Sequence, residues 1–213
     1  RAFNAAFDNA VESVGTDFRS KEAVKEFYTT VIRQTDPALL DDPGASAFWR
    51  GLSSLDPSEV YVYLNEVAGP EYANFVFRFS EYASYTEDSI KEYVDRLYSM
   101  ASKEKLNKVS KIVQACSRRL VEHRGTDLVY YGFTPGVGVS RVLAGFPTQE
   151  LAAESGAGMR GYIVRVRPAP EHVHLYNLYR WRDMPIIVIK PENLIAIKEW
   201  TEIGWAANFL PPA

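Results

Sequence analysis

The sequence lacks most of the features that mark specialised classes of protein. A single cysteine among 213 residues excludes an internal disulfide and predicts an intracellular, reducing compartment. No apolar run has the length of a membrane span, and the N-terminus shows no signal-peptide pattern. A net charge of only −3 gives no field that would recruit nucleic acid or an anionic membrane. We therefore expect no membrane partner.

The remaining composition is that of an ordinary soluble globular protein, with 46% hydrophobic and 24% charged residues. A chain of this length can bury a substantial core, as one large domain or two modest ones. It begins at Arg1 without an initiator methionine, so we expect a processed product or a piece of a longer protein.

Familiar catalytic and metal-binding motifs are also missing. There is no G-x-S-x-G elbow, and Cys116 falls on the apolar seam of a predicted helix, where a buried thiol is inert. His172 and His174 flank one residue at a predicted strand end, but no third ligand follows at a recognisable spacing, so we predict no metal site. The loop Gly136-Val137-Gly138 lacks the Lys-Ser/Thr pair of a P-loop.

One basic and aromatic stretch is a possible surface for single-stranded nucleic acid. Between Arg160 and Arg182, five arginines are interleaved with three tyrosines and a tryptophan, as in base-stacking surfaces. Residues 126–213 nevertheless hold eight acidic and eight basic side chains, which favours a solvated strand face. We do not expect nucleic acid as a partner.

The composition changes near residue 125 and divides the chain into two parts. Helical spacing dominates before this point, whereas eight of the twelve prolines, most glycines and several β-branched runs follow it. Gly125 supplies a helix-stopping residue at the joint. We predict a helical domain over residues 1–125 and an α+β domain over residues 126–213.

The first part contains recognisable helix signals. Asp56-Pro57-Ser58-Glu59 combines an N-cap residue, an early proline and a capping-box glutamate. Thr86 can cap a helix with apolar residues at helical spacing from Ile90, through Tyr93, to Ala101. A second apolar seam steps by three and four through Leu106, Val109, Val113, Cys116 and Leu120.

The second part predicts strands. They cover Asp127 to Phe133, Gly161 to Arg167, Pro185 to Lys190 and Leu194 to Trp200. The run Ile186 to Ile189 is apolar on both faces, so we expect a central strand. From Leu128 to Phe146 the pattern predicts a strand, a turn at Gly132 and a short helix ending at Gly145. Gly132 has no Cβ, which lets a ligand approach the backbone.

Four segments of the second part follow the order of motifs in a known fold. They are Leu128–Gly132, Val142–Phe146, Gly156–Val166 and Pro185–Ile195. Together they resemble the ADP-ribosyltransferase superfamily, which includes diphtheria- and cholera-type toxins and poly-ADP-ribose polymerases. The resemblance implies an α+β fold, with a helical N-terminal region followed by a split-β-sheet ADP-ribosyltransferase-like domain, and NAD as the cofactor.

The resemblance also implies roles for single residues. Tyr131 stands where the family has a His or Arg that holds NAD, and Gly132 keeps the backbone that clasps the nicotinamide amide. Tyr162 would stack on or position the nicotinamide. The catalytic Glu aligns with Pro185, so the nearest carboxylate that could stabilise the cationic sugar is Asp183.

Ser155 is an alternative to Tyr162 for the role beside the nicotinamide.

Two functions stay open after this comparison. The altered positions favour a non-catalytic domain that acts as a structural or partner-binding module, such as a surface or assembly protein cut from a longer precursor. Its partner would be another protein or further copies of the chain, and the apolar-aromatic tail from Trp205 to Ala213 favours docking. The alternative is an active NAD-dependent ADP-ribosyltransferase that uses Asp183 to modify a protein or nucleic acid.

Overall fold

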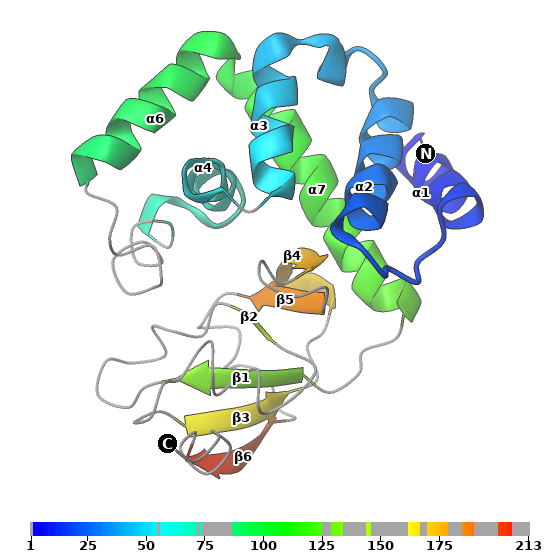
Figure 1. The fold of residues 1–213 in the computed structure, drawn as a ribbon, viewed down its shortest axis with the longest axis vertical. Helices are drawn as coiled ribbons and strands as arrows, with labels where there is room; N and C mark the ends of the chain where they lie inside the picture. The colour runs from blue at the N-terminus through cyan, green and yellow to red at the C-terminus, as the bar shows by residue number, and fades with distance from the viewer. Residues whose placement is uncertain are drawn as a thin grey trace.

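The computed structural model describes residues 2–54, 56–71, 73, 87–124, 129–133, 144–145, 162–166, 170–178, 185–189 and 200–205. Helices lie at one end of the molecule and strands at the other (Figure 1). The helices are α1 (Ala2–Ser13), α2 (Lys21–Thr35), α3 (Pro43–Ser53), α4 (Pro57–Ala68), α6 (Glu87–Met100) and α7 (Lys103–Arg124), with a short 3-10 turn η1 (Leu39–Asp41) before α3.

The predicted helix start at Asp56 is confirmed, but its capping differs from the capping box. Pro57 opens α4 after an extended Asp56, which makes no side-chain cap hydrogen bond. The Glu59 carboxylate instead accepts a hydrogen bond from the Ser58 hydroxyl at 2.7 Å. It lies against Gly51 of α3, where an added Cβ would come within 2.4 Å of the Glu59 Cδ. Packing between α3 and α4 therefore draws Glu59 away from the helix end.

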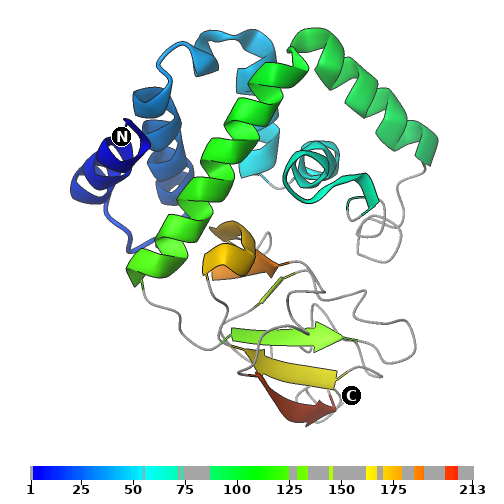
Figure 2. The same ribbon diagram turned by 180° about the vertical axis from the view of Figure 1, so that it is seen from behind.

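Helix α7 is the long element against which α2, α3 and α4 pack, as the view from behind shows (Figure 2). Its predicted apolar seam is confirmed, because all five positions from Leu106 to Leu120 are fully buried. Leu97 of α6 and Ala101, which directly follows α6, are buried as predicted, whereas Tyr93 is 42% exposed and carries Arg96 over its ring. Thr86, the predicted cap of α6, lies outside the described residues.

The described strands form two antiparallel three-stranded sheets. One has the order β1-β3-β6 and the other β2-β5-β4. Their bounds are β1 (Val129–Phe133), β2 (Ala144–Gly145), β3 (Tyr162–Val166), β4 (Val173–Leu178), β5 (Pro185–Ile189) and β6 (Trp200–Trp205), with a 3-10 turn η4 (Pro170–His172) before β4. Strand β5 lies between two neighbours, which confirms the central strand predicted from its apolar faces.

Two predicted features are wrong where the structure describes them. Gly132 was expected to form a turn, but it lies within β1, opposite Ile163 of β3. Ala144 and Gly145 were expected to end a helix, but they form β2 and pair with Val188 and Ile187 of β5. The backbone N–H and C=O groups along both edges of a central strand need partners, and β2 pairs with one edge of β5. The rest of the predicted helix, and the predicted strand from residue 194 to 199, lie outside the described residues.

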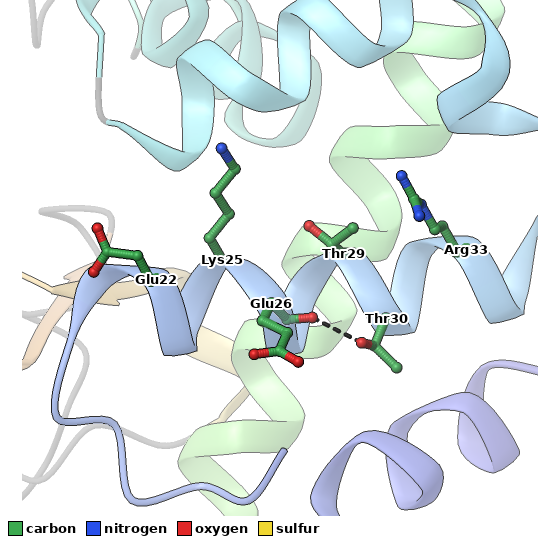
Figure 3. A pocket seen from close by; sticks show the side chains of 6 residues that line it. All are labelled: Glu22, Lys25, Glu26, Thr29, Thr30 and Arg33. Carbon is green, nitrogen blue, oxygen red and sulfur yellow. Dashed lines mark hydrogen bonds between the residues drawn. The ribbon is translucent and has the colours of Figure 1, made fainter. Parts of the chain in front are cut away.

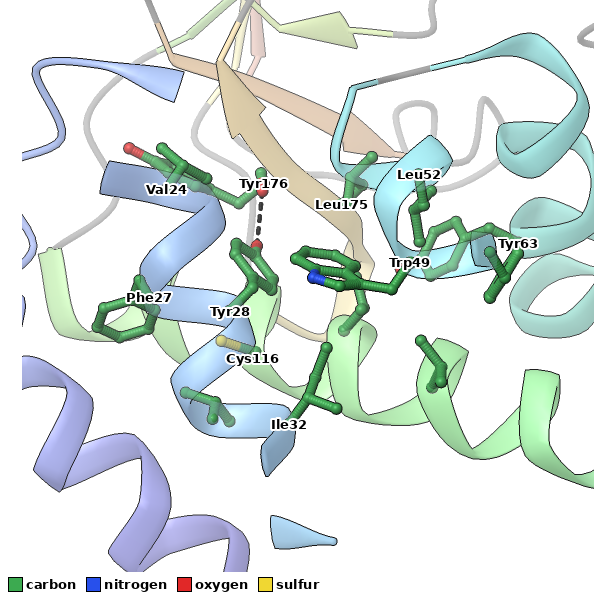
Figure 4. Close-up of a cluster of buried hydrophobic side chains, with 14 of the residues drawn as sticks. Val24, Phe27, Tyr28, Ile32, Trp49, Leu52, Tyr63, Cys116, Leu175 and Tyr176 are labelled. Carbon is green, nitrogen blue, oxygen red and sulfur yellow. Dashed lines mark hydrogen bonds between the residues drawn. The ribbon is translucent and has the colours of Figure 1, made fainter. Parts of the chain in front are cut away.

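Strand β4 joins the helices to the sheets. It pairs with β5 on one side, and Val173, Leu175 and Tyr176 are buried in the same hydrophobic cluster as the helices (Figure 4). The described part of the chain is thus mainly helical and combines helices with antiparallel sheets. None of the helices in this part has both the length and the apolar character that a membrane span requires.

Candidate functional site

Three of the four predicted site positions lie on neighbouring strands. Tyr131 and Gly132 belong to β1, and Tyr162 is the first residue of β3. The two strands pair antiparallel, with Gly132 opposite Ile163, the residue next to Tyr162. The fold therefore brings the first and third motif segments of the resemblance together at the level of the backbone.

The fourth segment lies in the other sheet, together with Ala144 and Gly145 of the second segment. Pro185 is the first residue of β5 and sits opposite Leu178 of β4, so the strand start expected from its missing N–H is confirmed. Asp183, the predicted catalytic carboxylate, lies outside the described residues. So do Ser155 and the loop from Gly136 to Gly138.

The positions on β1 fit part of what NAD would require. Strand β1 is an outer strand of its three-stranded sheet, so one row of its backbone N–H and C=O groups is not used by β3. A residue without a Cβ at position 132 leaves such groups accessible to an amide. The charge requirement is not met, because a tyrosine at position 131 carries no positive charge.

A polar contact that the sequence does not reveal lies where β4 meets the helices. Side chains from α2, α4 and α7 each donate a hydrogen bond to a backbone carbonyl of β4. The bonds run from Tyr28 to Tyr176 at 2.6 Å, from Tyr63 to His174, and from Arg118 Nε to Val173 at 3.0 Å. Because β4 is an outer strand of its sheet, these donors cover the edge that β5 leaves open.

The groups around this contact are held in their neutral forms. Burial raises the pKa of the Tyr28 and Tyr63 hydroxyls well above the ordinary value of 10.0. Burial likewise raises the pKa of the Cys116 thiol, which has no exposed surface, so its predicted burial is confirmed. The arrangement can position a strand, but it offers no activated nucleophile.

The two histidines of the second part do not share one strand. His172 ends η4, whereas His174 lies in β4, where it is buried and its Nδ1 is 3.4 Å from Nε2 of Gln114. Across the ranges given above, no three His, Cys, Asp or Glu side chains gather closely enough to hold a metal ion.

No protein-family model, curated protein or solved structure matches this chain. Its function is therefore argued from its own residues and their arrangement.

Proposed function

We propose that residues 126–213 form a split-β-sheet domain of the ADP-ribosyltransferase type that no longer catalyses transfer and acts as a structural or partner-binding module. In this proposal residues 1–125 form its helical companion domain. The observation that carries the proposal is the distribution of the motif segments over the strands. The first and third segments include the paired strands β1 and β3, and the second and fourth include β2 and β5, which pair in the other sheet.

The loss of catalysis is argued from charge. Transfer of ADP-ribose develops positive charge on the sugar, and a carboxylate placed beside it supplies the largest stabilising effect. Pro185 stands where that carboxylate is expected, and it has no ionisable group. Tyr131 can donate one hydrogen bond to NAD but cannot supply the charge of an arginine. Both changes lower the affinity for the reacting state.

A binding role is supported by how the second sheet is held. Three side-chain donors and a continuous hydrophobic cluster fix β4 against α2, α4 and α7. An enzyme that closes on its substrate draws its moving parts from weakly held elements. A sheet anchored to the helical core is better suited to presenting a fixed surface to a partner.

The release of nicotinamide from NAD tests the proposal without knowledge of the acceptor, because water can take the ribosyl group. We expect no release above background from the wild-type chain. Release that is lost in Asp183→Asn would contradict the proposal and favour the active transferase.

The second measurement is calorimetric titration of NAD, up to about millimolar concentration, into the double variant Tyr131→Arg/Pro185→Glu, which restores the charges that the family uses.

We expect this double variant to bind NAD and the matched control Tyr131→Arg/Pro185→Gln to bind it more weakly. If the double variant keeps the wild-type circular dichroism but binds no NAD, the ADP-ribosyltransferase type of fold is wrong. Should the double variant fail to fold, Tyr131→Arg alone gives the same comparison with the wild-type chain.

A further inference from the structure

A hollow of about 430 Å³ lies along one face of helix α2, on the side away from the core (Figure 3). Its lining follows the spacing i, i+3, i+4, i+7, i+8 and i+11, so it forms one continuous helical face. The residues are Glu22, Lys25, Glu26, Thr29, Thr30 and Arg33.

The centre of this α2 face differs from its ends. Thr29 and Thr30 are half-buried, and both hydroxyls have partners within the chain. Thr29 accepts a hydrogen bond from Trp49 Nε1 at 3.0 Å, and Thr30 donates one to the Glu26 carbonyl at 2.8 Å. The two hydroxyls are thus already engaged within the chain. Short side chains at this point allow another helix to approach closely.

The ends of the α2 face carry exposed charges. In the described part of the chain, no ion pair involves Glu22, Lys25, Glu26 or Arg33, although other exposed helical charges are paired, as Arg119 is with Glu122. Glu26 and Arg33 are seven residues apart, which places them in one row about 10 Å apart along the helix. They have opposite charge, and the two threonines lie midway between them.

We propose that the α2 face binds the α2 face of a second copy of this chain, antiparallel and across a two-fold axis centred between Thr29 and Thr30. In this register Glu26 of each copy faces Arg33 of the other, and Lys25 falls opposite the neutral Gln34. The same ion pair then forms twice, as an isologous interface requires. The inference rests on the partner-binding part of the proposed function and is independent of whether the sheets bind NAD.

The charge pattern favours a second copy over a partner of one charge sign. A purely basic or purely acidic segment would be repelled by Arg33 or by Glu26, respectively, at one end of the face. One helix pair is smaller than a standard interface of roughly 1,600 Å², so we expect a weak dimer. Because its ion pairs are exposed, the dimer should weaken as salt rises.

Sedimentation equilibrium of the whole chain tests this proposal at about 0.05 M and about 0.5 M salt, between which the Debye length falls from roughly 14 Å to about 4 Å. We expect concentration-dependent dimers that are weaker at high salt. Glu26→Arg or Arg33→Glu should each raise the dimer dissociation constant about tenfold or more, because each replaces two attractions by two repulsions. Lys111→Glu and Asp95→Arg are matched charge reversals on exposed positions of α7 and α6 and should leave the constant unchanged.

An equimolar mixture of the two single variants decides the register. Glu26→Arg chains should pair with Arg33→Glu chains, because each facing pair is again of opposite sign. The double variant Glu26→Arg/Arg33→Glu should dimerise with itself. The proposal is overturned if the wild-type chain stays monomeric at both salt concentrations, which would leave this face to a different protein. It is also overturned if single reversals do not weaken the dimer, or if the mixture forms no mixed dimer. Circular dichroism of each variant checks that α2 stays folded.

Discussion

Replacing Tyr28 by phenylalanine tests the contact between the helices and β4. The substitution removes one oxygen and leaves the ring, so the hydrophobic packing around Trp49 and Phe27 is kept. It removes the donor that reaches the Tyr176 carbonyl at 2.6 Å, at a site where Tyr28 is only 2% exposed. Loss of a hydrogen bond to a buried backbone carbonyl costs about 2 kcal/mol.

The Tyr28 hydroxyl belongs to a short row of polar contacts that runs from α7 to β4. Tyr28 also lies 2.8 Å from the Ser117 hydroxyl, which itself lies 2.8 Å from the Val113 carbonyl. Two hydroxyl protons thus serve three short contacts. The Val113 carbonyl can accept an amide of its own helix, so we infer that Ser117 donates to Tyr28 and Tyr28 donates to β4. A chain of donors in this order strengthens each bond.

Urea denaturation and thermal melting measure the effect. We expect Tyr28→Phe to lower the unfolding free energy by about 2 kcal/mol and the melting temperature by roughly 4–8 °C. The control is Tyr93→Phe, which removes the same oxygen from a side chain 42% exposed and should change the free energy by less than about 0.5 kcal/mol. If the two variants unfold at the same urea concentration, the Tyr28 bond to β4 does not contribute as argued.

Three further predictions concern the helical core. Gly44→Ala should lower the free energy of unfolding by about 3 kcal/mol, because a Cβ there would lie 2.4 Å from the Met100 carbonyl. Gly51→Ala should change it by less than about 1 kcal/mol, since the added Cβ would meet only the movable Glu59 side chain. Urea titrations of the two variants make this comparison. Burial raises the pKa of Tyr63 in the folded chain, so Tyr63 ionises at a lower pH in the unfolded chain than in the folded one. The free energy of unfolding should therefore fall as pH rises above about 10. A urea midpoint of Tyr63→Phe as pH-sensitive as that of the wild-type chain would contradict this. Cys116 should react with a maleimide only as fast as the chain unfolds, and rapid labelling in native buffer would show that the thiol is not buried.

Local patterns predicted the elements whose burial follows from their own spacing. The seam from Leu106 to Leu120 could be read from steps of three and four, and the central position of β5 from its apolar run. Exposure of Tyr93 could not be predicted, because its spacing equals that of a core residue. Only the packing of α6 at the edge of the bundle decides it.

Long-range contacts were beyond such patterns. Tyr28 and Tyr63 each bond to a strand more than 100 residues away, and no spacing within α2 or α4 encodes a carbonyl that far along the chain. In the predicted site, the pairing of β1 with β3 brings Gly132 near Tyr162, and the alternation within either strand does not encode which strand it pairs with. The role of the site depends on side-chain charges, and for these the resemblance gives expectations at Tyr131, Asp183 and Pro185.

The closed edge of β4 limits how this chain can bind a partner. An outer strand ordinarily offers its backbone to an added strand. At β4, an incoming strand would have to displace the donors Tyr28, Tyr63 and Arg118 and uncover the buried Val173. Sheet extension at this edge is therefore unfavourable. Helix α2 has two distinct faces, since its inner face holds β4 through Tyr28 while its outer face carries the exposed side chains of Glu26 and Arg33.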